Sequence, residues 1–185
     1  MKKDQDIIQV TITKPKLYQH KMMLKIGDWK KHFDLNYVKT IIAIALNHYT
    51  KNNSFFINGY LITNQNLYLI VQTNEKTIEV IIKKIEAQII LLLKFNPQKI
   101  KEKPDKIAFI ADDESVFYPA WKTLFKSYPL ENDYLVKLIT GKKVTLPYFD
   151  QNLESIKTII HNQAFCSSIN YLGGIGPVEV TPTTD

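Results

Sequence analysis

Two short β-prone segments separated by a polar break constrain the fold of this chain more than any other feature. Residues 55–62 and 67–72 are rich in Phe, Tyr, Ile and Leu, and Thr63-Asn64-Gln65-Asn66 between them has the length and polarity of a hairpin loop. On both sides of this pair, apolar residues recur at three and four residue spacing, the period of an amphipathic helix. The pattern predicts a β-hairpin flanked by helices, within an α+β domain.

The two flanking helices have recognisable ends. Asp34 has the side chain of an N-cap for a helix that runs to about Asn52. Residues 73–95 form a second helical stretch, which Asn96-Pro97 closes because proline cannot continue a helix. The apolar face of this second stretch is unusually wide, which suits a helix lying across a sheet or one covered in part by a second copy in a homodimer.

Two further β-prone runs complete a sheet. Residues 17–26 precede the first helix, and residues 107–110 follow the second helix after a charged connector. The order strand, helix, strand, strand, helix, strand is that of the ferredoxin-like βαββαβ fold, an antiparallel sheet with both helices on one face. Beyond it we expect C-terminal helical appendages near residues 118–126, 132–140 and 152–163.

The 185-residue chain is predicted to form one domain, residues 1–172, followed by a flexible tail or a surface-draped strand over residues 173–185. The single cysteine, Cys166, excludes an internal disulfide, and the polar start of the chain does not resemble a signal peptide, so a cytoplasmic location is expected. The most apolar window, residues 78–95, is interrupted by charged side chains. No membrane span is therefore predicted.

Lysine alone carries the positive charge of the chain. All 24 Lys+Arg residues are lysines and the formal net charge is +6, which gives a sequence pI of about 9.2. Part of this bias reflects the residue usage that AT-rich coding sequence favours. A basic chain attracts phosphate backbones, and lysine, a mobile point charge, favours backbone contacts over the reading of base edges.

The hairpin carries a resemblance to a known family. The run from Phe56 to Val71, FINGYLITNQNLYLIV, and the helix end Lys94-Phe95-Asn96 resemble the corresponding segments of single-tyrosine HUH transposases, in particular the group associated with repetitive extragenic palindromes in bacteria. A weaker similarity continues through residues 121–127 and 133–135, so the resemblance covers roughly residues 17 to 140. It implies a DNA partner, single-stranded or hairpin.

The resemblance also implies a chemistry for which this sequence lacks the residues. In the family, two histidines on one strand hold a divalent metal, which polarises a phosphate for attack by a helix tyrosine. Residues two apart on a strand share a face, and here those positions hold Asn66 and Tyr68. Asparagine offers only a carbonyl oxygen, and a neutral phenol is a poor metal ligand. No tyrosine stands near residues 140–143, where the family's nucleophile falls. We therefore expect no catalytic residue and no metal cofactor.

The leading hypothesis is a catalytically degenerate, transposase-like protein that binds DNA without cutting it. Aromatic side chains would stack on unpaired bases, and lysines beside them would contact phosphates. The lysines predicted for this role are Lys21, Lys25, Lys122, Lys126, Lys142 and Lys143.

Two alternatives stay open. The first is a metal-dependent nickase or strand-transferase that recruits other groups, such as His20, His48 or Asp112, and uses one of four tyrosines as nucleophile: Tyr118, Tyr128, Tyr134 or Tyr148. The second is a domesticated scaffold that uses the apolar helix face for protein contacts. Asn66 and Tyr68 could also be no more than a half-buried strand face.

Overall fold

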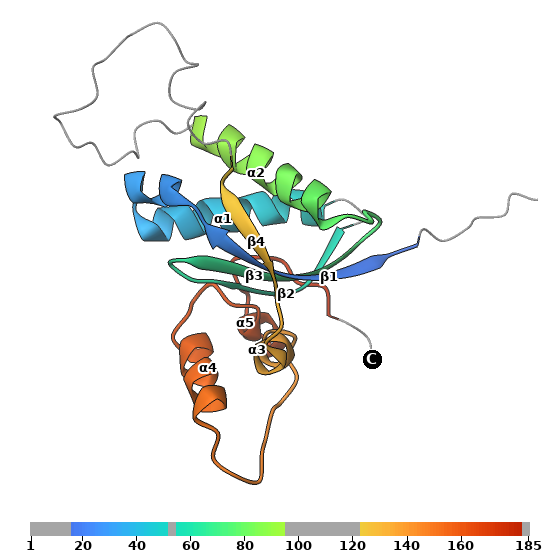
Figure 1. The fold of residues 1–185 in the computed structure, drawn as a ribbon, viewed down its shortest axis with the longest axis vertical. Coiled ribbons are helices and arrows are strands. Elements are labelled where there is room, and N and C mark those ends of the chain that lie inside the picture. The colour runs from blue at the N-terminus through green and yellow to red at the C-terminus, as the bar shows by residue number, and fades with distance from the viewer. Residues whose placement is uncertain (1–15, 52–54, 95–122, 183–185) are drawn as a thin grey trace, which may run out of the picture.

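A computed structural model describes residues 16–51, 55–94 and 123–182 of the chain (Figure 1). The described residues form an α+β fold around one antiparallel sheet of four strands, in the order β2-β3-β1-β4. In chain order the elements are β1 (Tyr18–Ile26), the 3-10 helix η1 (Asp28–His32), α1 (Leu35–Thr50), β2 (Phe55–Ile62), β3 (Asn66–Thr73), α2 (Ile78–Lys94), β4 (Phe125–Pro129), α3 (Asp133–Ile139), α4 (Gln151–His161) and α5 (Ser168–Tyr171).

The larger core lies between the sheet and helices α1 and α2, which Figure 1 shows on the same side of the strands. Asp34 caps α1 as predicted, because its side chain accepts hydrogen bonds from the backbone N–H groups of Asn36 and Tyr37. The strands turn alternate residues toward this core, as the period of two requires. The buried strand residues on this side are Met22, Leu24 and Ile26 of β1, and Leu67, Leu69 and Val71 of β3.

A smaller core lies on the opposite side of the sheet, where α3, α4 and α5 are drawn in Figure 1. Leu61 of β2 and Ile70 of β3 pack there against apolar side chains of α3 and α4. The principal sheet contact of α3 is with β2. The C-terminal helices thus bury the β2 side of this face.

Strand β4 lies where the sequence predicted a helix. The predicted helix over residues 118–126 is wrong at its described end, because Phe125–Pro129 pairs antiparallel with β1. Phe125 is buried and Lys126 is exposed, as expected where successive side chains of a strand point to opposite faces of the sheet. The strand predicted at residues 107–110 lies outside the described residues.

Long-range hydrogen bonds fix the start of β4. The carbonyl oxygen of Leu124 accepts hydrogen bonds from the Gly27 N–H at 2.8 Å and from the Trp29 indole N–H at 3.0 Å. The Glu86 carboxylate of α2 accepts from the backbone N–H groups of Leu124 at 2.7 Å and Phe125 at 2.9 Å. One α2 side chain therefore aligns the edge strand.

We expect Glu86→Ala to destabilise the fold by about 2 kcal/mol, because two backbone donors lose a charged acceptor. Glu86→Gln keeps one acceptor oxygen and should lose less. Glu79→Ala removes the same charge from an exposed position of α2 and serves as the control. Urea denaturation measures all three, and equal losses for Glu86→Ala and Glu79→Ala would contradict this role for Glu86.

The C-terminal segment, for which the sequence predicted a flexible tail or a draped strand, follows β2 over residues 177–181. The Thr181 N–H donates to the Ile57 carbonyl at 2.8 Å, and Val178 is fully buried. The Val178 N–H also lies 3.4 Å from the hydroxyl oxygen of Tyr60, to which it donates. The phenol of Tyr60 is thereby enclosed between β2 and this segment.

Burial of Tyr60 should make stability depend on alkaline pH. Burial raises the pKa of Tyr60 from its ordinary value of 10.0 to about 12. Above pH 10 the unfolded chain ionises this tyrosine while the folded chain keeps it neutral, so stability is full below pH 10 and falls as the pH approaches 12. We expect the wild type to lose about 2–3 kcal/mol more than Tyr60→Phe across this window. Urea denaturation at successive pH values measures the difference, and parallel curves would contradict it.

Candidate functional site

Two rows of side chains cross the sheet on the side opposite α1 and α2. In the first row Lys25 of β1 pairs with Asn66 of β3 and with Lys126 of β4. In the second row Met23 of β1 pairs with Tyr68 of β3 and with Tyr128 of β4. Their neighbours on β1 and β3, together with Phe125 on β4, point into the larger core, so these side chains face the other way. We call these six residues the open face: Met23, Lys25, Asn66, Tyr68, Lys126 and Tyr128.

The open face combines exposed positive charge with half-buried aromatic rings. Lys25 and Lys126 are exposed, while Asn66, Tyr68 and Tyr128 are half-buried. The Lys126 ammonium lies 5.5 Å from the centroid of the Tyr128 ring, within the range of a cation–π contact. The Asn66 amide donates to the Tyr68 hydroxyl at 3.3 Å. Tyr68 also packs against the smaller core, which fixes its position.

Lys25 and Lys126 are direct cross-strand partners of like charge. Such a pair destabilises a sheet, because side chains directly opposite one another are only about 5 Å apart at Cβ. A third lysine, Lys30, lies close enough to Lys25 for their charges to interact. The nearby carboxylate of Asp28 pairs with Lys31, 2.8 Å away, and also attracts Lys30 and Lys25. An anion bound across this row would relieve the repulsion between Lys25 and Lys126.

Asn66 and Tyr68 share one face of β3, as alternation predicts. Residues 16–51, 55–94 and 123–182 contain no group of three His, Cys, Asp or Glu side chains that could hold a metal ion. His20 lies on the core side of β1, with its Nε2 atom 2.9 Å from the Glu75 carbonyl oxygen. His48 stacks edge-on against Tyr49 on α1. Neither histidine is brought to the open face.

The tyrosines considered as nucleophiles are dispersed. Tyr134 of α3 donates its hydroxyl to the Asp150 carboxylate at 3.2 Å, and desolvation together with the charge of Asp150 raises the pKa of Tyr134. A raised pKa opposes formation of the nucleophilic phenolate. Tyr148 stands in the exposed loop before α4, and Tyr128 belongs to the open face. Tyr118 and Asp112 lie outside the described residues.

The structure divides the predicted nucleic-acid-binding lysines into two groups. Lys25 and Lys126 meet on the open face. Lys21 and Lys142 line one hollow of about 380 Å³ beside α3, and Lys142 and Lys143 line a larger groove of about 1110 Å³ between α3, α4 and α5. Lys122 lies outside the described residues.

Sequence reasoning missed three contributors to these surfaces. Met23 is one, and its position between two lysines on the same strand face was visible from alternation alone. Lys137 in the hollow and Lys157 in the groove are the others. No local signal marks those two, because helix packing brings them there.

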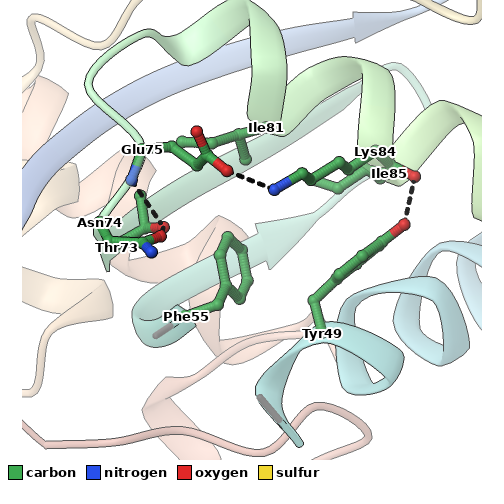
Figure 2. Close-up of a pocket in the computed structure, with 8 residues that line it drawn as sticks. All are labelled: Tyr49, Phe55, Thr73, Asn74, Glu75, Ile81, Lys84 and Ile85. Atoms are coloured by element: carbon green, nitrogen blue, oxygen red, sulfur yellow. Dashed lines mark hydrogen bonds and ion pairs between the residues drawn. The ribbon is translucent and has the colours of Figure 1, made fainter. Parts of the chain in front are cut away.

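A separate small pocket lies between α1, α2 and the ends of β2 and β3 (Figure 2). Its volume is about 40 Å³, enough for about one water molecule. Figure 2 shows the Lys84 ammonium paired with the Glu75 carboxylate, and the Tyr49 hydroxyl donating to the Lys84 carbonyl at 2.7 Å. These bonds join α1, α2 and the end of β3, so we assign this pocket a packing role.

Comparisons with known proteins add no assignment: no family model, no curated protein and no solved structure matches this chain. Of the helices that the structure describes, none is both long enough and apolar enough to cross a membrane. A function for the open face must therefore be inferred from the residues of this chain.

Proposed function

We propose that the open face binds single-stranded or hairpin DNA and does not cut it. The observation that carries the proposal is the direct pairing of Lys25 with Lys126 beside Tyr68 and Tyr128. Lysines at this spacing supply the charge that phosphates neutralise, and tyrosine rings offer surfaces on which unpaired bases stack. An exposed sheet face with these two kinds of side chain suits a strand whose bases are splayed out.

A finer assignment of the fold belongs to the same proposal. The order β2-β3-β1-β4, with α1 and α2 on one side, fits the ferredoxin-like arrangement. We infer a degenerate transposase-like domain, in which Asn66 and Tyr68 stand at the former metal-binding positions. Strand pairing places Asn66 beside Lys25 and Tyr68 beside Met23 on the open face. This position supports the use of that surface for binding alone.

The alternative of a protein-interaction scaffold finds less support. The wide apolar face of α2 is turned into the larger core, where Ile81, Ile85 and Ile89 are buried. Among the large apolar side chains of α2, Leu91 is the one that is exposed. A single exposed leucine is ordinary for a protein surface.

The test is a salt titration of binding to hairpin, single-stranded and duplex DNA, with and without Mg²⁺. We expect affinity to fall steeply as salt rises, because each neutralised phosphate releases counterion. Single-stranded and hairpin DNA should bind more tightly than duplex, and Mg²⁺ should produce neither cleavage nor a covalent tyrosine adduct. Binding that is absent or insensitive to salt would refute the proposal, and a covalent adduct would favour the nickase alternative.

Substitution of Tyr128, whose ring lies on the edge strand β4, tests how much base stacking contributes to DNA affinity. We expect Tyr128→Ala to weaken single-stranded DNA binding by about 1–3 kcal/mol, the range for loss of one stacked base. Tyr128→Phe keeps the ring and should bind nearly as the wild type does. Fluorescence anisotropy at fixed salt measures both variants, and equal affinities for Tyr128→Ala and the wild type would exclude stacking on this residue.

A further inference from the structure

The groove between α3, α4 and α5 has an apolar floor and a basic rim. Leu138, Ile160, Ile169 and Leu172 provide apolar lining. Lys142, Lys143, Lys157 and His161 provide basic groups, and among the described residues no Asp or Glu lines the groove. Lys157 does have a counter-charge in Glu154, which pairs with it at 2.7 Å from outside the lining. Such a surface is complementary to an anion that carries apolar groups.

Lysines stand at intervals between the groove and the open face. Lys142 lines both the groove and the hollow beside α3, and Lys21 lines that same hollow. Lys21 and Lys25 lie on the same side of β1, four residues apart, which is about 13 Å along a strand. Asp133 also lines the hollow, yet Lys21, Lys137 and Lys142 outnumber it there. Positive charge thus runs from the open face to the groove.

We propose that the groove holds the unpaired end of the DNA strand that lies on the open face. This inference rests on the function proposed above. It adds the path of the bound strand, from the open face into the groove, and requires a strand long enough to reach both. Bases would pack on the apolar floor near Ile160 and Ile169, while phosphates lie against Lys143 and Lys157. An acidic peptide has similar charge, but the position of Lys142 and Lys21 between the two surfaces favours one strand crossing both.

The experiment compares short and long oligodeoxythymidines, about 6 and about 15 nucleotides, which bracket the site sizes of single-strand binders. Anisotropy is measured for the wild type, for the groove variant Lys143→Ala/Lys157→Ala and for the open-face variant Lys25→Ala/Lys126→Ala. The longer strand offers about ten overlapping registers to a site of about six nucleotides, which alone gives up to about tenfold tighter binding. We define the length advantage as the excess over that factor, and for the wild type it should be at least about tenfold, since the second surface adds lysine contacts. The groove variant should erase this length advantage and leave the short strand unaffected, whereas the open-face variant should weaken both.

A reporter in the groove gives a second readout. Leu172 is 87% exposed, so Leu172→Trp should fold normally, and its fluorescence should respond to the long strand and not to the short one. A length advantage that survives in the groove variant would overturn the groove assignment while the open-face proposal stands. So would an acidic peptide, such as oligoglutamate, that shifts the tryptophan signal while long oligodeoxythymidine does not. Failure of the wild type to bind either strand would refute the proposed function itself.

Discussion

Lys126→Glu is expected to weaken single-stranded DNA binding by about tenfold or more at low salt while leaving the stability of the protein nearly unchanged. In the proposed binding mode, the substitution removes one phosphate contact and places a carboxylate in the path of the DNA backbone, so the slope of log affinity against log salt should fall by about 0.7 or more. The same carboxylate stands directly opposite Lys25. It converts a repulsive cross-strand pair into an attractive one, which should contribute about 0.2–1 kcal/mol to stability. The substitution also removes the cation–π contact of Lys126 with Tyr128, worth about 0.5–1 kcal/mol at an exposed site, so the two effects on stability should nearly cancel.

The expected loss of affinity without a loss of stability makes this pair of measurements informative. A variant that loses affinity because it is damaged should also unfold at lower denaturant concentration, whereas Lys126→Glu should unfold at nearly the same concentration as the wild type. The control is Lys83→Glu, which makes the same charge change at an exposed position of α2, on the other side of the sheet. If Lys83→Glu lost as much affinity as Lys126→Glu, net charge alone would explain the binding and the open face would have no special role.

The elements that the sequence predicts well are those with local signals. Alternation and a polar break define the hairpin of β2 and β3, and the Asp34 cap with helical periodicity defines α1. Strand β4 has no such signal: five residues, FKSYP, lie in a segment with aromatic residues at helical spacing. Its strand conformation comes from pairing with β1 and from hydrogen bonds to Glu86. Tertiary contacts of this kind override local propensity.

The same distinction applies to the site. The shared face of Asn66 and Tyr68 follows from their spacing, as does the shared face of Lys21 and Lys25. The partnership of Lys25 with Lys126 requires the register between β1 and β4, which the misassigned helix concealed. The groove depends on where α4 and α5 pack against α3, and no sequence spacing encodes that arrangement.

The turn that leads into the groove depends on one glycine. Gly141 has a φ of +78° and follows α3 in a Schellman motif, in which the Lys142 N–H donates to the Lys137 carbonyl at 2.8 Å. A Cβ atom at this position would lie 2.4 Å from the Tyr171 ring. That ring is held in place because the Tyr171 hydroxyl donates to the Asn58 carbonyl at 2.6 Å. The turn therefore sets both the end of α3 and the placement of Lys142 on the groove rim.

Gly141→Ala should destabilise the protein by about 3 kcal/mol, since the left-handed conformation costs about 1–2 kcal/mol and overpacking about 1–3 kcal/mol more. Gly173 is a matched control: it follows α5 in a second Schellman motif with a φ of +87°, and no atom of the described residues lies within 4 Å of the position that a Cβ would take there. Gly173→Ala should therefore cost only the conformational part, about 1–2 kcal/mol. Urea denaturation of both variants isolates the contribution of the Tyr171 contact. The double variant Gly141→Ala/Tyr171→Ala should lose less stability than the sum of the losses of its two single variants, because the clash is absent without the ring. Equal losses for the two glycines would mean that the Tyr171 ring yields freely and that the turn does not fix the groove rim.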